Sequence, residues 1–230
     1  MKKSVLILMV IIFTTFSSFA QLKFGADVYS RYNWRGLDFG NAPAFQPSLA
    51  ITAGGFTIGA WGSYAFPTTA TTYAENDLYA SYVVSSESAG NFTLLFTDYY
   101  YPSAGIKFSD FQKNGGAHTM EAGITYSGPE KFPIALAVYL NVHNDIDNSS
   151  YIQIGYPFAV YDATVTIAAG FVPSKSAYYL TNKAGLINLN ITAAKSIAVA
   201  EKFSIPINVS YIVNPALDIT YLVFGAGFTF

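Results

Sequence analysis

The stretch IALAVYLNVH, residues 134–143, decides the expected fold class of this chain. Its large apolar residues stand at every second position, with smaller or polar residues between them: Ile134, Leu136, Val138, Leu140 and Val142 against Ala135, Ala137, Tyr139, Asn141 and His143. Successive side chains of a β-strand point to opposite faces. The alternation therefore predicts a strand with one lipid-compatible face and one mixed face. Residues 22–28, 45–52 and 187–192 repeat the pattern.

About twelve segments of this kind follow one another, each roughly ten residues long, which suits a tilted membrane-spanning strand. We expect strands over 22–35, 44–53, 56–66, 75–85, 92–101, 117–127, 133–143, 150–156, 161–172, 185–195, 203–213 and 219–230. Pro157 should end the eighth strand, because proline lacks the N–H that a strand ladder requires. We also expect a bulge near Thr97 or Asp98, because Asp98 would otherwise share the lipid-facing side of Phe96.

The composition favours a membrane protein over a soluble domain. Hydrophobic residues make up 52% of the chain and charged residues 11%, against about 25% charged residues in ordinary soluble domains. Residues 21–230 never reach the ~18 consecutive apolar residues of a transmembrane helix. A closed antiparallel transmembrane β-barrel resolves this, because it places lipid-facing residues at every second position. The lack of cysteine excludes disulfides, and a net charge of −2 offers no basic surface for nucleic acid.

The first twenty residues are expected to be a signal peptide. Lys2 and Lys3 form its positive start, residues 5–13 are an unbroken apolar run, and Ser18 and Ala20 supply the small residues before a cleavage site. The apolar run is too short for the alternative, an uncleaved anchor. We therefore expect cleavage after Ala20, followed by a barrel over 21–230 and export to the outer membrane of a Gram-negative-type bacterium.

The connections between the expected strands alternate in length. Residues 54–55, 86–91, 127–132 and 157–160 form short connections, whereas 67–76, 102–117 and 173–184 form long ones. Outer-membrane barrels have short periplasmic turns and longer extracellular loops. An even number of strands with both termini in the periplasm produces this order.

The last strand carries an expected assembly signal. Phe224, Phe228 and Phe230 stand at alternating positions that end at the last residue of the sequence. A terminal phenylalanine in this pattern resembles the signal that the barrel-assembly machinery reads in outer-membrane proteins. The alternative is a core strand of a soluble protein that ends this way by chance.

Several motifs resemble the TorF porin family. The sequence DVYSRYNWRGL at 27–37 is similar to its aromatic opening strand, and QPSL at 46–49, WGS at 61–63, END at 75–77 and YYYP at 99–102 follow in the order of that family. The resemblance covers the first hundred residues by motif, and the remainder by length and pattern. It implies an outer-membrane location and a porin activity, without a defined substrate.

Charged residues gather on the expected lumen face. Lys23, Asp27, Arg31 and Arg35 share one face of the first strand, and that face must be the lumen, because a charge at lipid depth costs ~2–4 kcal/mol. The other candidate pore-lining residues are Glu75, Asp77, Glu121, Tyr139 and Asn141. We expect Arg31 and Arg35 to lie at the height of Glu75 and Asp77, as a charged constriction that selects solutes. The alternative is an ion-paired plug.

The resulting functional prediction is passive passage of small solutes through a narrow, mixed-charge lumen. The alternatives are a non-conducting structural or adhesive barrel and, less favoured, a lipid-modifying enzyme using His143, Asn141 and Ser149 or Ser150. The enzyme is disfavoured because His143 would face the lumen, whereas a lipid-cleaving site must face the bilayer. We expect no enzymatic activity, no cofactor and no metal. The expected partners are outer-membrane lipids, the barrel-assembly machinery and small solutes, and no nucleic acid.

Overall fold

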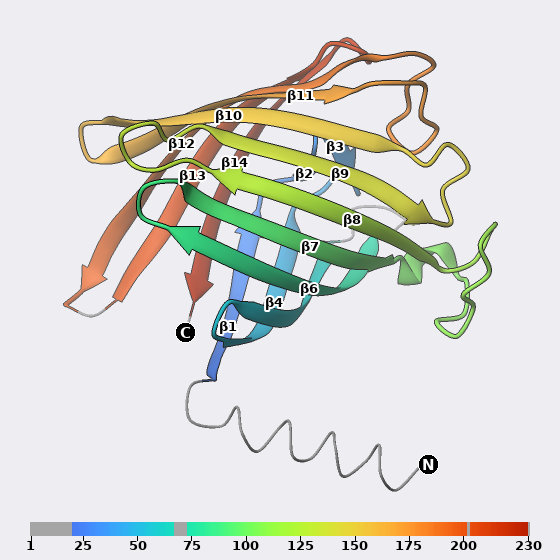
Figure 1. Cartoon of the computed structure of the whole chain (residues 1–230), viewed down its shortest axis with the longest axis horizontal. Helices are drawn as coiled ribbons and strands as arrows, with labels where there is room; N and C mark the ends of the chain where they lie inside the picture. The colour runs from blue at the N-terminus through green and yellow to red at the C-terminus, as the bar shows by residue number, and fades with distance from the viewer. Residues whose placement is uncertain (1–19, 67–72, 202, 230) are drawn as a thin grey trace, which may run out of the picture.

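A computed structural model describes residues 20–66, 73–201 and 203–229 of the chain (Figure 1). Twelve strands form the wall of one barrel: β1 (Gln21–Tyr29), β4 (Ala44–Ala53), β5 (Phe56–Ala65), β6 (Ala74–Ser86), β7 (Gly90–Tyr100), β8 (His118–Ser127), β9 (Ala135–His143), β10 (Ser150–Val160), β11 (Ala163–Val172), β12 (Gly185–Ala200), β13 (Phe203–Asn214) and β14 (Ile219–Thr229). In the described ranges, no helix is long and apolar enough to cross a membrane.

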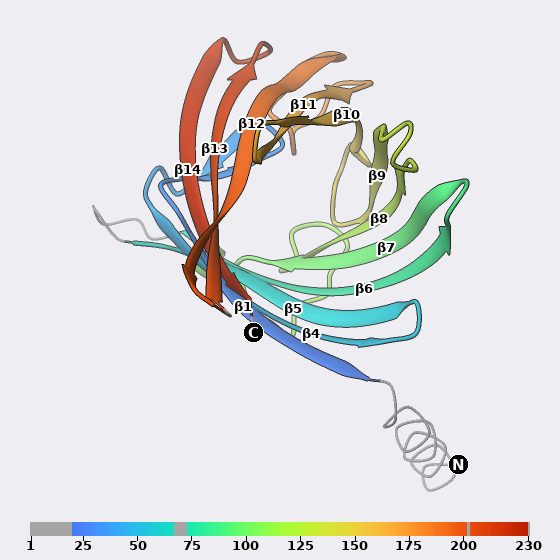
Figure 2. The ribbon, with the colours of Figure 1, turned by 90° about the vertical axis from the view of Figure 1, so that its left-hand side faces the viewer.

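The barrel is closed and antiparallel throughout, as the sequence predicted. Each wall strand pairs with the next one along the chain, and β1 pairs with both β4 and β14. Closure brings Val28 opposite Ala226, almost two hundred positions along the chain. Figure 2 looks into the resulting ring of strands. A closed ring leaves no unpaired sheet edge, which is the condition for a sheet in contact with lipid.

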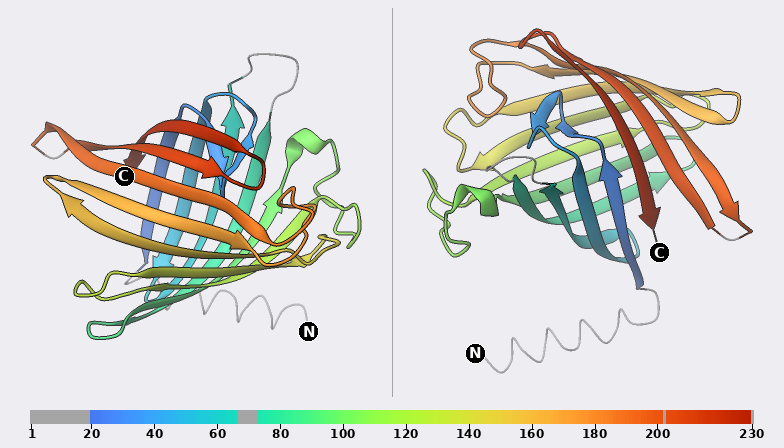
Figure 3. Two further views of the ribbon diagram at one scale, coloured as in Figure 1. Left: turned by 90° about the horizontal axis from the view of Figure 1, so that it is seen from above. Right: turned by 180° about the vertical axis from the view of Figure 1, so that it is seen from behind.

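The two ends of the barrel differ in their connections. Residues 54–55, 87–89 and 161–162 connect strands at the end where β1 begins and β14 ends. The connections at the opposite end are mostly longer, and include 101–117 and 173–184. Figure 3 shows the long connections together at this end. We call it the loop end, and the other the turn end.

The wall separates an apolar outer face from a polar inner face. On β9, Val138 and Leu140 point outward and are each 44% exposed, whereas Asn141 points inward and is fully buried. The register of β9 is therefore the one that the alternation predicts, because a slip of one residue would exchange these faces. Large apolar side chains are likewise exposed on the outer face of every wall strand.

The expected first strand over 22–35 is wrong beyond Tyr29. Residues 32–39 leave the wall and form a separate two-stranded hairpin, β2 (Tyr32–Trp34) and β3 (Leu37–Phe39). Arg35 and Gly36 at its turn have φ angles of +52° and +82°. Two successive positive φ angles are the mark of a type I′ turn, which reverses a strand within two residues. We call residues 32–39 the lumen hairpin.

The expected end of the eighth strand at Pro157 is also wrong, because β10 continues to Val160. Its pairing with β9 stops at Gly155, and the residues beyond pair only with β11. Pro157 therefore lies where one edge of the strand is free, and its missing N–H costs no ladder hydrogen bond on that side.

The expected bulge at Thr97 or Asp98 is absent from the described residues, since β7 keeps an unbroken register with β6 and β8. Asp98 does share the outer face with Phe96, but the imidazole of His118 on β8 lies against its carboxylate. The Nδ1 atom of His118 lies 2.9 Å from Asp98 Oδ1, and its Nε2 lies 2.6 Å from the carbonyl oxygen of Phe108. Phe111 stacks on the same imidazole with ring centroids 3.9 Å apart. The outward carboxylate is thus paired and covered.

Barrel closure predicts a specific disulfide. The natural chain has no cysteine, so Val28→Cys combined with Ala226→Cys should cross-link on mild oxidation only if β1 and β14 pair in this register. Cross-linking is read as a mobility change that reductant reverses. Val28→Cys with Leu222→Cys, four residues out of register, is the matched control and should remain uncrosslinked. Equal cross-linking of both pairs would contradict the closure.

Candidate functional site

The lumen hairpin reaches across the inside of the barrel from the end of β1. A Cβ atom on Gly36 would lie 2.0 Å from the carbonyl oxygen of Ile187 on β12, so the turn presses its backbone against that strand. The side-chain amide of Asn214 on β13 donates to the carbonyl oxygen of Gly36 over 3.1 Å. Only glycine satisfies both the positive φ and this close approach.

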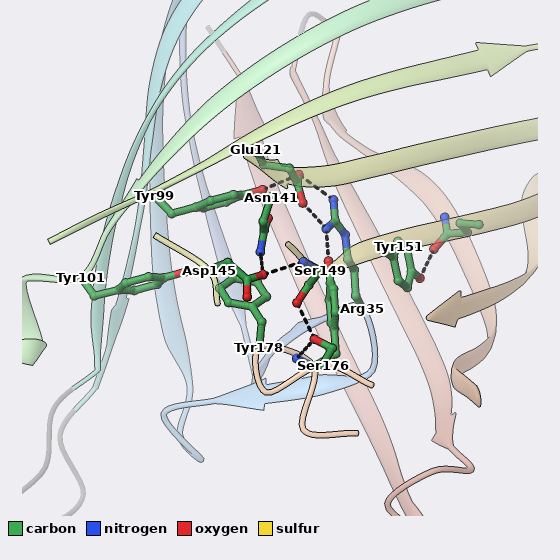
Figure 4. A network of polar contacts seen from close by, with 12 residues as sticks. Arg35, Tyr99, Tyr101, Glu121, Asn141, Asp145, Ser149, Tyr151, Ser176 and Tyr178 are labelled. Atoms are coloured by element: carbon green, nitrogen blue, oxygen red, sulfur yellow. Dashed lines mark hydrogen bonds and ion pairs between the residues drawn. The ribbon is translucent and has the colours of Figure 1, made fainter. Parts of the chain in front are cut away.

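Arg35, beside Gly36 at the turn, is clamped by a buried ion pair (Figure 4). Its two terminal nitrogens donate to the two carboxylate oxygens of Glu121 over 2.5 and 2.9 Å. Nη1 also donates to the hydroxyl of Tyr179. The side chains of Arg35 and Glu121 are 9% and 3% exposed. A bidentate pair fixes both the distance and the plane of the guanidinium group.

Aromatic rings surround the same guanidinium group. Its carbon lies 3.9 Å from the ring centroid of Tyr139, 4.2 Å from that of Trp34 and 4.8 Å from that of Tyr151. Cation–π contacts of this kind stabilise a desolvated cation by about 2 kcal/mol. The charge of Arg35 is therefore compensated inside the barrel, by the carboxylate of Glu121 and by the faces of three aromatic rings.

Two of these rings depend on glycines in the adjacent strands of the wall. A Cβ atom on Gly123 would lie 2.6 Å from the ring of Tyr139, and one on Gly170 would lie 2.0 Å from the hydroxyl of Tyr151. The missing side chains let both tyrosines lie close against neighbouring strands. This use of glycine beneath an aromatic ring is a recognised device for fixing a strongly curved sheet.

A second layer of polar contacts supports Glu121 from the loop end. The Tyr99 hydroxyl donates to Glu121 Oε1 over 2.9 Å. Nearby, the Asn141 amide donates to Asp145 over 2.8 Å, and the hydroxyls of Ser149 and Ser176 lie 2.6 Å apart. Connections 144–149 and 173–184 are therefore tied to each other and to the wall.

Charges in these connections are also paired. The Ala177 backbone N–H donates to Asp147 over 2.9 Å, and Lys175 lies 3.2 Å from the same carboxylate. The hydrogen bond from Ala177 and the proximity of Lys175 lower the pKa of Asp147. Burial raises the pKa of Tyr179, so its hydroxyl stays neutral beside Arg35. The carboxylates of Asp145 and Asp147 accept hydrogen bonds from the chain itself.

Arg31 and Arg35 form no ion pair with Glu75 or Asp77, and each has a different acidic partner. Arg31 pairs within the same segment, donating to Asp38 over 2.5 Å and to Asn41 over 2.7 Å. The reason is the inward turn: it gives each arginine a partner that an extended strand over 22–35 could not reach.

Glu75 and Asp77 are buried on the lumen face of β6, 3% and 7% exposed. The Tyr73 hydroxyl donates to Glu75 over 2.6 Å, and Asp77 Oδ1 has no hydrogen-bond partner among the described residues. Neither carboxylate has a basic partner within the described ranges. This part of the lumen therefore buries two carboxyl groups that have no basic partner among the described residues.

A polar cavity occupies the lumen on the side of β12, β13, β14, β1 and β4. Its volume is about 440 Å³. The residues that line it include Asp27, Tyr29, Arg31, Tyr32, Asn33, Gln46, Thr192, Asn208 and Ser210. Lys23 shares the face of Asp27 closer to the turn end and is exposed. The lumen is thus filled on the side of Arg35 and hollow on the other.

The expected terminal signals are only partly described. Phe224 points outward and is 52% exposed, and the ring of Phe228 stacks on Phe203 with centroids 6.3 Å apart. Phe230 and residues 1–19 lie outside the described residues.

Some residues of this site escaped the sequence analysis. Asp38, Tyr151 and Tyr179 contact the two arginines but belong to no motif. The Arg35–Gly36 dipeptide was the available signal, because glycine after a residue that tolerates positive φ favours a tight turn. No group of three or more metal-ligating side chains occurs in the described part of the chain.

Fold and lumen together define a closed twelve-strand β-barrel whose interior is partly filled by an inward-folded hairpin. The chain belongs to a bacterial family of unknown function, Gcw_chp, whose family model matches residues 15–212. No curated protein matches the chain at a significant level.

The turn of the lumen hairpin yields a stability prediction. Gly36→Ala should lower the free energy of unfolding by roughly 1–3 kcal/mol, because alanine disfavours φ of +82° and its Cβ would meet Ile187. Denaturant unfolding measures the change. Gly54→Ala is the control: its φ is also positive, at +60°, but no atom lies within 4 Å of the added Cβ. A loss no greater than that of the control would show that the contact with β12 is unimportant.

Proposed function

We propose that this protein is an outer-membrane barrel that lets small hydrophilic solutes pass through its lumen. The observation that carries the proposal is a polar cavity inside a closed barrel whose outer face is apolar. The lumen hairpin is the proposed constriction, since it narrows the barrel on one side and borders the cavity on the other.

The outer face supports the membrane location. Leu22, Leu94 and Leu222 are 58%, 59% and 56% exposed, and similar side chains surround the barrel. Soluble monomers rarely expose continuous apolar patches beyond a few hundred Å². Lipid is the environment that accepts such a belt, with alternating residues turned to the lumen.

The resemblance to the TorF porin family supports the passage of solutes. Its motifs lie far apart in sequence but meet in the lumen: 27–37 includes the turn with Arg35, 75–77 includes the two buried carboxylates, and 99–102 includes Tyr99 beside Glu121. Trp61, from a fourth motif, packs on Tyr32 with ring centroids 5.4 Å apart. The resembling residues are therefore those that shape the proposed path.

An outer-membrane location also requires a route of export and assembly. Export would use the signal peptide over 1–20, and the barrel-assembly machinery would recognise the last strand. Both termini would then be periplasmic, and the loop end would face the outside of the cell.

The second candidate is a non-conducting barrel that serves structure or adhesion. The clamp around Arg35 favours it, because a buried bidentate ion pair and stacked rings fill part of the lumen. This candidate differs from the first in one measurable property, the passage of ions.

We propose no catalytic role. His143 lies on the lumen face of β9, and the hydroxyl of Ser149 pairs with Ser176. Asn141 is engaged with Asp145. A lipid-cleaving set would instead have to bring serine and histidine together on the outer face.

The membrane location predicts opposite responses of two neighbouring residues on β12. Ile191 faces outward and is 46% exposed, whereas Thr192 lines the lumen cavity. Ile191→Arg should lower the free energy of unfolding in lipid vesicles by ~2–4 kcal/mol if it lies near the bilayer midplane. Thr192→Arg should be tolerated better. The reverse ranking would contradict a lipid-facing outer surface.

Single-channel recording in planar bilayers tests the passage of solutes. The unmutated protein should conduct, and Arg35→Met should raise its preference for cations because it removes a positive charge from the lumen. The same change should also cost ~3–5 kcal/mol of stability, because it leaves Glu121 buried and unpaired. Arg35→Met with Glu121→Gln is the charge-balanced control, with selectivity close to that of the unmutated protein. If the folded protein shows no measurable conductance, the passage of solutes is rejected and the non-conducting barrel is the remaining candidate.

A further inference from the structure

The lumen cavity contains a carboxylate without a counter-charge. We propose that this cavity binds a small organic monocation carrying a hydrogen-bonding group, with Asp27 as its anionic partner. The inference rests on the proposed passage of solutes and names the class of solute. It is carried by the composition of the cavity wall, in which a charged group, an aromatic face and an unsatisfied amide converge.

Asp27 is the group that sets the charge of the ligand. Among the described residues, no basic side chain forms an ion pair with it. The basic residue among those that line this cavity, Arg31, is already bound to Asp38 at 2.5 Å and to Asn41 at 2.7 Å. A carboxylate in a narrow lumen with no protein partner favours a cation in the adjacent space.

Tyr29 supplies an aromatic face beside this carboxylate. A Cβ atom on Gly225 of β14 would lie 2.2 Å from the tyrosine ring, so the ring lies against the barrel wall. Asn208 donates to its hydroxyl over 3.3 Å and holds the ring there. The ring therefore packs on the wall from one side, and its other side belongs to the cavity. Such a face attracts cations within about 6 Å.

Asn33 is the residue that favours a ligand with a hydrogen-bond acceptor. Its Nδ2 atom is buried and has no partner among the described residues, although leaving a buried donor without an acceptor is destabilising. The other polar pairs of the wall are satisfied: Thr192 with Ser210 at 2.8 Å, and Gln46 with Ser63 at 3.2 Å. A hydroxyl or carbonyl oxygen on the ligand would accept the missing hydrogen bond from Asn33 Nδ2.

Among the described residues, the wider lumen adds acidic groups without basic partners and leaves no such excess of basic groups around Arg35. The two carboxylates of β6, Glu75 and Asp77, also lack basic partners in the described ranges, whereas Arg35 is neutralised by Glu121. A neutral polyhydroxylated solute would use the tyrosine and the amides but would leave Asp27 unpaired.

The test compares three probes of nearly equal size: ethanolammonium, ethylene glycol and glycolate. Their binding to the full chain, refolded in detergent, is measured by saturation-transfer NMR. Ethanolammonium should bind most tightly, and its affinity should fall with added NaCl. Asp27→Asn should weaken it by about tenfold, the loss expected for a hydrogen bond to a charged group. Asp162→Asn, in a turn outside the lumen, is the matched control and should bind as the unmutated protein does.

The outcomes separate this inference from the proposed function. Selective binding that Asp27→Asn abolishes supports the site even if the protein conducts no ions. Equal binding of the three probes, or ethanolammonium binding that neither salt nor Asp27→Asn alters, overturns it. Conductance without binding of any probe overturns the site and leaves solute passage standing. If Asp27→Asn fails to fold, Tyr29→Leu serves instead and should also weaken ethanolammonium binding.

Discussion

The bidentate pair between Arg35 and Glu121 is the contact on which the arrangement of the lumen depends. A guanidinium group inside a barrel must be compensated, since an unpaired buried charge costs several kcal/mol. Here the positive group, Arg35, lies on the lumen hairpin, and the negative group, Glu121, lies on β8. The pair therefore holds the hairpin across the lumen, and the position of the hairpin decides which part of the interior is filled.

Glycine makes this arrangement possible at two levels. Gly36 lets the turn meet β12 backbone to backbone. Gly123 and Gly170 let Tyr139 and Tyr151 lie against the wall, where they present their faces to Arg35. Rings held flat occupy little of the radius of the barrel. As a result, a barrel of only twelve strands, whose width is close to the limit for side-chain filling, accommodates both a hairpin and a cavity.

The two sides of the lumen have different chemistry. On the side of β7 to β11, opposite charges are paired and aromatic rings are stacked, which favours rigidity. On the side of β12 to β14, β1 and β4, polar groups line an open volume, and Asp27 has no described counter-charge. The position of the lumen hairpin produces this asymmetry, because its ion pair and stacked rings fill one side of the interior only.

The sequence by itself determined the wall of this protein. A period of two fixes which residue faces which side, and short connections favour the pairing of consecutive strands; both are local properties of the chain. It also identified the charged lumen residues, including Asp27, Arg35 and Glu121.

Only the tertiary structure decided their partners. Residues 22–29 and 32–34 have the same alternation, but the chain turns inward at 30–31 because the ion pair with Glu121 and the contact with Ile187 stabilise the hairpin, and those partners lie 86 positions and more along the chain. Pro157 shows the same limit: a proline is tolerated within β10 because β9 no longer pairs with the strand there. Asp98 shows it too, because an outward-facing carboxylate is tolerated where His118, twenty residues away, contacts it.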